Sequence, residues 1–188
     1  MLDTYLMTLH GLTLRQLADA EQLADVVGLD RSEVEAALEK AVGAGAVMAA
    51  RGSYMITPDG RDLLDATYPE VFASIRSDAA IGAAVDAFET GVNKDTLAAT
   101  TDWQLEGPNP KTVDRLHAIH KKLTRVLAPL AAADPGMERF FDRLASSLDR
   151  VDAGENDYVS GVRVDSFHTV WFQMHEHLLR LTGRERPE

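Results

Sequence analysis

Cysteine is absent from the 188 residues of this chain. Its absence excludes disulfide bonds, zinc–thiolate sites, iron–sulfur clusters and cysteine nucleophiles. No apolar run approaches the length of about 18 residues that a membrane-spanning helix needs. The N-terminus also lacks the charged, apolar and small-residue segments of a secretory signal peptide. We therefore expect a cytoplasmic protein that has no membrane partner.

Basic side chains are scarce relative to acidic ones. The chain carries 19 Lys and Arg residues against 30 Asp and Glu residues, which gives a formal net charge of −11. Residues 1–65 hold five of the basic and eleven of the acidic side chains, whereas residues 111–188 are balanced. This excess of negative charge disfavours non-specific binding to nucleic acid or anionic lipid. The hydrophobic content of 45% is that of an ordinary folded protein.

Two short helices near the N-terminus are predicted from their capping residues. Asp19 is followed three residues later by Gln22, and Asp30 is followed at the same interval by Glu33. In such a capping box, each side chain bonds a backbone N–H group that the first helical turn leaves free. Gly28 is expected to end the first of these helices, because glycine readily adopts the left-handed conformation found at helix C-termini.

A β-hairpin is predicted to follow these helices. Two short runs, 46–50 and 53–56, are separated by a two-residue turn that contains glycine, which is typical of a hairpin. A threonine–proline pair at 57–58 then predicts the start of another helix. This order of helices, hairpin and helix is that of a winged helix-turn-helix domain, which we assign to residues 1–65.

The stretch Leu17–Leu64 resembles the MarR-like winged-helix domains of bacterial regulators. Its segment ITPDGRDLL, residues 56–64, is similar to the LTPxGR stretch that follows the wing in that family. The resemblance implies a homodimeric transcription regulator that binds double-stranded DNA through its third helix and its wing. The residues expected to contact DNA are Arg31, Ser32, Lys40, Arg51 and Tyr54.

The predicted third helix is acidic for a DNA-reading element. Glu33, Glu35 and Glu39 belong to this helix and would approach phosphate groups. Affinity for DNA comes largely from the neutralisation of phosphates by basic side chains, so these carboxylates weaken the expected binding. Dimerisation would double the favourable contacts. The alternative is that the winged helix serves as a docking surface for another protein.

Residues 66–188 are predicted to form a helical bundle that senses a ligand or mediates dimerisation. Apolar residues recur at helical spacing in 111–130, 137–151 and 165–182. The sequence Glu-Gly-Pro-Asn-Pro at 106–110 is the best candidate for a linker. The expected fold class is therefore mainly α, with a winged helix-turn-helix at the N-terminus, its two-stranded wing and a C-terminal helical bundle.

A second resemblance covers the C-terminal region. The segment VDSFHTVWFQMHEHLLRLTGRER, residues 164–186, resembles the helical tail of a group of actinobacterial winged-helix proteins. The dipeptides Trp103-Gln104 and Leu116-His117 belong to the same resemblance. Some members of the group are fused to, or related to, phosphoenolpyruvate-utilising enzymes such as pyruvate phosphate dikinase. This implies an alternative function as an accessory or regulatory subunit that docks on such an enzyme. The phosphohistidine segment of the dikinases is absent, so their chemistry is not implied.

Histidines and aromatic residues in the C-terminal region allow three interpretations. They could bind a metal, fill semi-buried structural positions with Asp165 capping the last helix, or line a pocket for a small-molecule effector. The spacing is not that of a strong metal motif, since the rings of His175 and His177 point about 200° apart on a helix. We therefore expect no metal and no other cofactor. The candidate ligand-binding residues are Trp103, Gln104, Arg115, His117, Asp165, His168, Trp171, Phe172 and His175.

Catalytic motifs are absent from the sequence. It contains no GxSxG, P-loop, dinucleotide-binding or HExxH pattern. Ser166 and His168 are close in sequence, but side chains two residues apart diverge on a helix. We therefore expect a protein that is not an enzyme.

Overall fold

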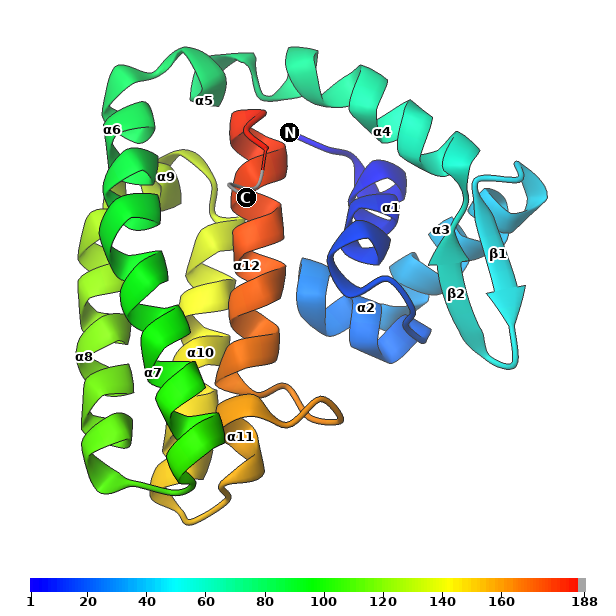
Figure 1. The fold of residues 1–188 in the computed structure, drawn as a ribbon. Helices are drawn as coiled ribbons and strands as arrows, with labels where there is room; N and C mark the ends of the chain where they lie inside the picture. The colour runs from blue at the N-terminus through cyan, green and yellow to red at the C-terminus, as the bar shows by residue number, and fades with distance from the viewer. Residues whose placement is uncertain (186–188) are drawn as a thin grey trace. The chain divides into compact units, whose positions relative to one another are not determined.

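The computed structural model of the protein describes residues 1–185 and is mainly helical, with one two-stranded antiparallel sheet (Figure 1). The chain divides into two compact units. Unit 1 comprises Met1–Arg76 and Glu176–Glu188, and unit 2 comprises Ser77–His175. The sequence placed a domain boundary after residue 65, whereas the units divide after Arg76 and again within the last helix. Unit 1 therefore needs the end of the chain as well as its beginning.

Unit 1 begins with three helices, continues with a hairpin and returns to helix. The helices α1, α2 and α3 contact one another, and α1 also contacts α4 and the hairpin. The last turns of α12 complete this unit. The elements are α1 (Thr4–Arg15), α2 (Ala20–Val27), α3 (Arg31–Gly43), β1 (Val47–Ala50), β2 (Ser53–Ile56), α4 (Pro58–Val71) and α5 (Ala73–Ser77).

The helix starts predicted in unit 1 are confirmed. The capping box at Asp19 forms with both of its hydrogen bonds, and at the start of α3 the Glu33 carboxylate accepts a hydrogen bond of 3.2 Å from the Asp30 N–H. The Thr57 hydroxyl accepts a hydrogen bond from the Gly60 backbone N–H, and Pro58 occupies the first turn of α4. Gly28 ends α2 in the left-handed conformation, with φ of 68°. Local sequence signals therefore determine where these helices begin and end.

The predicted hairpin is also confirmed. Val47 pairs with Ile56, and the register continues to Ala50 and Ser53 at the turn. Arg51 and Gly52 form the turn with φ of 54° and 82°, as in the tight turns that suit twisted hairpins. Ala18, between α1 and α2, adds an isolated antiparallel bridge to Tyr54. The hairpin is thereby attached to the segment that precedes α2.

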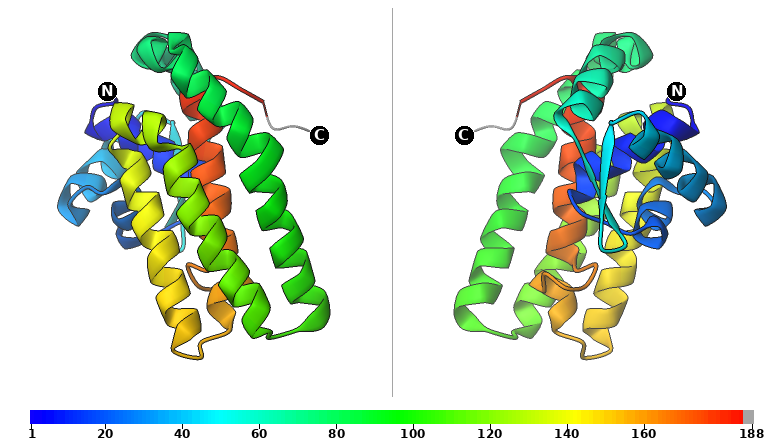
Figure 2. Two further views of the ribbon diagram at one scale, coloured as in Figure 1. Left: turned by 90° about the vertical axis from the view of Figure 1, so that its left-hand side faces the viewer. Right: turned by 90° about the vertical axis from the view of Figure 1, so that its right-hand side faces the viewer.

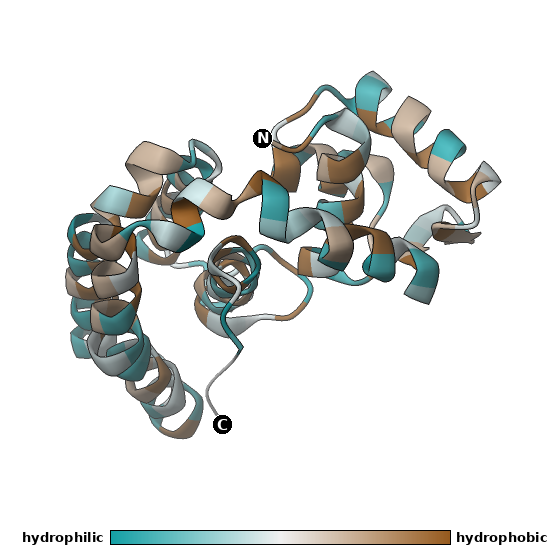
Figure 3. Cartoon of the chain, turned by 90° about the horizontal axis from the view of Figure 1, so that it is seen from above, coloured by the Kyte–Doolittle hydropathy of each residue, from teal (hydrophilic) through white to brown (hydrophobic). Residues whose placement is uncertain are grey.

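Unit 2 is built from helices only. In Figures 1 and 2, α6, η1 and α7 follow one another as one continuous helix that lies beside α8, and α8 contacts both α7 and α10. Apolar and polar residues alternate along the helices in Figure 3, as expected for helices with one buried face. The elements are α6 (Ala79–Ala87), η1 (Phe88–Val92), α7 (Asn93–Glu106), α8 (Pro110–Val126), α9 (Ala128–Ala133), α10 (Gly136–Asp152), α11 (Asp157–Ser160) and α12 (Phe167–Thr182), whose residues from Glu176 onward belong to unit 1.

Three details of unit 2 differ from the sequence prediction. The helix predicted over 111–130 is divided at Leu127 into α8 and α9, because Pro129 lies in the first turn of a new helix. Residues 106–110 do not separate domains, since they join α7 to α8 within one unit. Asp165 does not cap the last helix. Ser166 does so, because its Oγ accepts a hydrogen bond from the Thr169 N–H at 3.2 Å.

A π-helical turn, η1, joins α6 to α7 without a break in the helical path. Its residues are Phe-Glu-Thr-Gly-Val, and helical periodicity alone did not predict it. Such turns insert one residue into a helix and often occur at functional sites. Here the turn places Phe88 and Val92 in the core, both with no exposed surface. No helix among residues 1–185 is long and apolar enough to cross a membrane.

Candidate functional site

The residues predicted to contact DNA lie on α3 and the hairpin. Arg31 and Ser32 are exposed at the start of α3, and Lys40 is exposed near its end. Arg31 is already engaged by acidic neighbours, with its Nε 2.8 Å from Glu35 Oε1 and its Nη1 3.7 Å from Glu21 Oε2. These exposed pairs are weak and reversible, so they compete with phosphate contacts without excluding them.

The other three candidates have different surroundings. The Lys40 ammonium lies 4.7 Å from the centre of the Tyr5 ring, in a cation–π contact. Arg51 is exposed at the hairpin turn. Tyr54 is half-buried, and its backbone exchanges hydrogen bonds with Ala18. The exposed charged residues of α3 are two basic and three acidic side chains, namely Arg31, Lys40, Glu33, Glu35 and Glu39.

Most of the nine predicted ligand-binding residues are not gathered in one place. Arg115 binds Asp102 at 2.9 Å, and His117 Nε2 lies 3.1 Å from Asp152 Oδ2. Trp103 is buried, whereas its neighbour Gln104 is exposed. Arg115 and His117 are thus held by two different local partners. The pocket expected to be formed by all nine residues is not observed, because helical periodicity does not determine which helix faces meet.

Asp165, His168 and Phe172 also make separate contacts. Asp165 Oδ2 accepts a hydrogen bond of 2.8 Å from Arg143 Nη2 on α10. His168 and Phe172 meet edge-on, with ring centres 4.9 Å apart, and the Phe172 side chain is exposed. Burial lowers the pKa of His168 below its ordinary value. This ring is therefore neutral near pH 7, as expected for a histidine with a structural position.

Trp171 and His175 do belong to a common network, which is centred on η1. His175 Nε2 lies 2.6 Å from Glu89 Oε1, and the Trp171 indole N–H donates to Asn93 Oδ1 at 3.2 Å. The Asn93 amide donates to Glu89 Oε2 at 3.0 Å, which closes the network. Phe88 stacks on Trp171 and meets His175 edge-on. The π-helical turn thus supplies the partner of His175, and the first residue of α7 supplies the partner of Trp171.

A second buried network lies in unit 1 and was not predicted. His10 Nδ1 lies 2.7 Å from the Tyr68 hydroxyl, and His10 Nε2 lies 2.8 Å from His177 Nδ1. Burial lowers the pKa of His10 well below its ordinary value, and the nearby His177 and Arg180 act in the same direction. Burial raises the pKa of the Tyr68 phenol. The chain of three side chains connects α1, α4 and α12.

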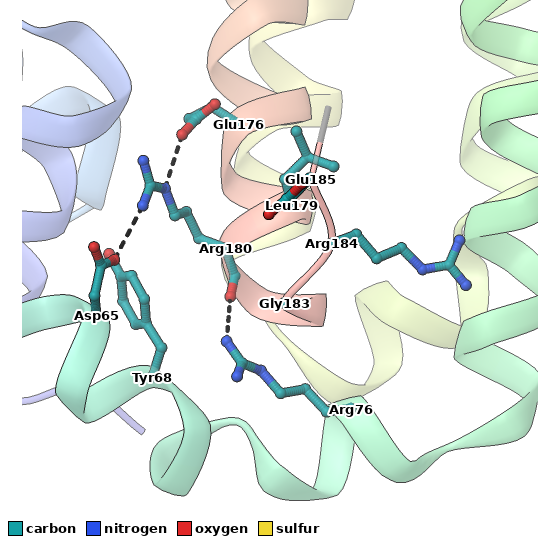
Figure 4. Close-up of a pocket in the computed structure, with 9 residues that line it drawn as sticks. All are labelled: Asp65, Tyr68, Arg76, Glu176, Leu179, Arg180, Gly183, Arg184 and Glu185. Carbon is teal, nitrogen blue, oxygen red and sulfur yellow. Dashed lines mark hydrogen bonds and ion pairs between the residues drawn. The ribbon is translucent and has the colours of Figure 1, made fainter. Parts of the chain in front are cut away.

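Beside this network lies a pocket of about 340 Å³ in unit 1 (Figure 4). Tyr68 belongs to both features, since its hydroxyl bonds His10 and its side chain lines the pocket. The lining carries arginines and carboxylates in equal number, with little apolar surface. Its residues are Asp65, Tyr68, Arg76, Glu176, Leu179, Arg180, Gly183, Arg184 and Glu185.

Metal binding is not supported by the arrangement of potential ligands. Within residues 1–185, no three His, Asp or Glu side chains come close enough to hold an ion. His120 of α8 has a backbone partner, since its Nε2 lies 3.0 Å from the Phe141 carbonyl oxygen. Comparison with models of protein families, with curated protein sequences and with solved structures gives no match.

One of the overlooked residues left a signal in the sequence. His10 lies within residues 8–14, Thr-Leu-His-Gly-Leu-Thr-Leu, all of which are buried. A polar side chain in such a segment requires a hydrogen-bond partner, so His10 could have been identified as part of a buried network. Arg76 and Glu89 left no comparable signal, because each has a polar neighbour in the sequence and reads as an ordinary exposed charge of a helix.

Proposed function

We propose that the chain is a non-enzymatic regulatory protein whose unit 1 is a winged helix-turn-helix resembling that of MarR-like transcription factors. The observation that carries the proposal is the order α1, α2, α3, hairpin and α4, with Ala18 bridged to Tyr54 at the base of the hairpin. In a winged helix, the third helix reads DNA and the hairpin contacts the adjoining backbone. Arg31, Ser32, Lys40, Arg51 and Tyr54 would make those contacts.

The helices of unit 2 would act as a bundle for dimerisation or for sensing a small molecule. A two-fold dimer places two reading helices about 34 Å apart, one turn of B-DNA, and doubles the number of phosphate contacts. Occupation of an effector site would change the spacing of the two winged helices and so change DNA affinity.

The test is a fluorescence titration of the full chain with DNA from upstream of its own gene, at two salt concentrations. A specific dimer should bind at nanomolar to micromolar concentration and weaken steeply as salt rises. Arg51→Gln should lower the affinity and reduce the salt dependence. Arg125→Gln is the matched control, since Arg125 is exposed on α8 and bonds only the Lys121 carbonyl oxygen. Absence of binding at micromolar protein and low salt overturns the proposal.

A second candidate function is favoured by the charge of α3. Its three exposed glutamates outnumber its two exposed cations, and Arg31 is paired with two carboxylates. A surface of this charge suits a partner protein with a basic face. In this reading, unit 1 docks on a phosphoenolpyruvate-utilising enzyme, as the resemblance of the C-terminal segment implies.

One double variant separates the two candidates. Replacing Glu35 and Glu39 with glutamine removes two negative charges from the exposed face of α3. If α3 reads DNA, the variant should bind DNA more tightly, because two repulsive groups near phosphates are lost. If α3 docks on a basic protein surface, the variant should bind that enzyme more weakly in the same buffer.

A further inference from the structure

The pocket of unit 1 has the size of a small-molecule site and a lining rich in charged side chains. Its volume of about 340 Å³ lies within the range of roughly 300–1,000 Å³ typical of ligand sites. The lining residues come from α4, from α5 and from the last turns of α12 and the residues after it. Two segments that are a hundred residues apart in sequence, 65–76 and 176–185, therefore form one lining.

Arg180 is neutralised by its own neighbours in this pocket. Its Nε lies 2.8 Å from Glu176 Oε1, and its Nη1 lies 3.1 Å from Asp65 Oδ1. Figure 4 shows the guanidinium of Arg180 between these two carboxylates. The two carboxylates more than balance its charge, so Arg180 is not the group that attracts an anion.

Arg76 has a different environment. Its Nε and Nη2 donate to the carbonyl oxygens of Leu181 and Arg180 at 3.2 and 3.1 Å, and no carboxylate among the described residues pairs with it. These two bonds hold the guanidinium against Gly183, where an added Cβ would lie 2.9 Å from Arg76 Cζ. The position is therefore fixed, while Nη1 makes no hydrogen bond within residues 1–185.

We propose that this pocket binds a small organic acid, a carboxylate or a phosphate, through the Arg76 guanidinium. A preorganised arginine that lacks a carboxylate partner provides a charge-assisted hydrogen bond to an oxyanion. Tyr68 and Leu179 provide the less polar part of the lining, against which the carbon skeleton of the ligand packs. The site lies in unit 1, whereas the sequence placed the effector residues in the C-terminal region.

Binding at this site has a direct path to α3. Tyr68 of the pocket bonds His10 of α1, and α1 contacts α3. A ligand that displaces Tyr68 would alter the contact between α4 and α1. The claim that the ligand is a regulatory effector rests on the proposed function, whereas the claim that it binds beside Arg76 does not.

The experiment follows the side-chain Nε–H resonance of Arg76 in the full ¹⁵N-labelled chain. The probes are acetate, pyruvate, succinate, citrate, inorganic phosphate and glycerol 3-phosphate at constant ionic strength. At least one probe should shift the Arg76 resonance saturably at a concentration below about 10 mM. Arg76→Gln lacks this resonance, so in that variant binding is followed through the Gly183 backbone amide, which lies against residue 76, and it should weaken by about tenfold or more. Arg125→Gln, which removes an exposed arginine of unit 2, should leave it unchanged.

A second variant is expected to bind the anion more tightly, which a misfolded protein would not do. Asp65→Asn removes a negative charge from the lining and frees Arg180 Nη1, so it should tighten anion binding by about threefold. Saturable binding with this pattern supports the site, even if no DNA binding is found. The inference is overturned if no probe shifts the Arg76 resonance, or if the shifts are equal in wild type and Asp65→Asn.

Discussion

At the scale of single residues, His10 determines how unit 1 responds to acid. The ring is buried between Tyr68 and His177, with Arg180 near enough to oppose a positive charge. The lowered pKa of His10 means that the folded protein resists a proton that the unfolded chain accepts below a pH of about 6.5. Protonation of His10 therefore adds no pH dependence to the stability above that pH, and it destabilises the fold progressively below it.

We predict that replacing His10 with leucine reduces the loss of stability on acidification. Between about pH 7.5 and pH 5.5, the wild type should lose on the order of 1 kcal/mol more unfolding free energy than the variant. Urea unfolding at both pH values, followed by circular dichroism, measures the difference. Equal losses in the two proteins would show that His10 accepts a proton in the folded state.

The pair of Glu89 and His175 is a buried polar contact of unit 2. Their side chains are 15% and 4% exposed, so each is largely removed from water. We predict that Glu89→Gln lowers the unfolding free energy by about 2 kcal/mol, because the buried His175 ring then faces a neutral amide in place of a carboxylate. Glu155→Gln is the matched control, since its pair with Arg150 is exposed and should contribute less than about 1 kcal/mol. Tryptophan fluorescence during urea unfolding reports both values. A smaller loss for Glu89→Gln than for Glu155→Gln would contradict the prediction.

At the scale of the elements, capping residues and glycines determine where helices begin and end, and one glycine allows α4 to pack closely against residue 46. Gly60, in the first turn of α4, approaches the hairpin so closely that an added Cβ would lie 2.3 Å from the Ala46 carbonyl oxygen. Gly43, the last residue of α3, has no atom within 4 Å of the same position. The two glycines are both helical, but only Gly60 is required for packing.

We predict opposite effects for alanine at these two positions. Gly60→Ala should lower the unfolding free energy by about 2–3 kcal/mol, because backbone must move to admit the methyl group. Gly43→Ala should be neutral or stabilising by up to about 1 kcal/mol, since alanine favours helix over glycine. Thermal and urea unfolding of both variants provide the measurement. A Gly60→Ala variant of wild-type stability would mean that α4 does not approach Ala46 in solution.

At the scale of the whole molecule, the end of the chain completes the unit formed by its beginning. His177, Leu178, Leu179 and Leu181 are buried, and all belong to unit 1. His10 and Tyr68 would lose the third member of their network without them. The first 76 residues by themselves therefore lack part of their core.

We predict that a chain ending at residue 175 cannot fold unit 1 to its full stability. Its amide resonances from residues 1–76 should show reduced dispersion and faster hydrogen exchange than those of the full chain. Resonances from residues 77–175 should be affected less. Unchanged exchange in residues 1–76 would show that the residues after His175 contribute nothing to their stability.

The helices and hairpin of unit 1 could be predicted from the sequence because their signals are local. Asp19, Thr57 and the Arg51-Gly52 turn each act on atoms a few residues away, and each was found as predicted. Asp30 precedes α3 as predicted, with its N–H bonded to Glu33. The assignment of Asp165 as a cap was wrong by one residue, since a serine beside it has the correct position for the Thr169 N–H. Where two neighbouring polar residues at a helix start can both cap it, residue type alone does not show which of them does.

The sequence by itself determined the caps, the turn and the amphipathic faces, because these depend on hydrogen bonds and periodicities within a few residues. Only the tertiary structure decided that His10 meets His177, that Glu89 meets His175, and that Arg76 lies against Gly183. His10 and His177 are 167 residues apart in sequence, and Glu89 and His175 are 86 residues apart. Their meeting depends on which helix faces pack together, and that choice is made by the whole core at once.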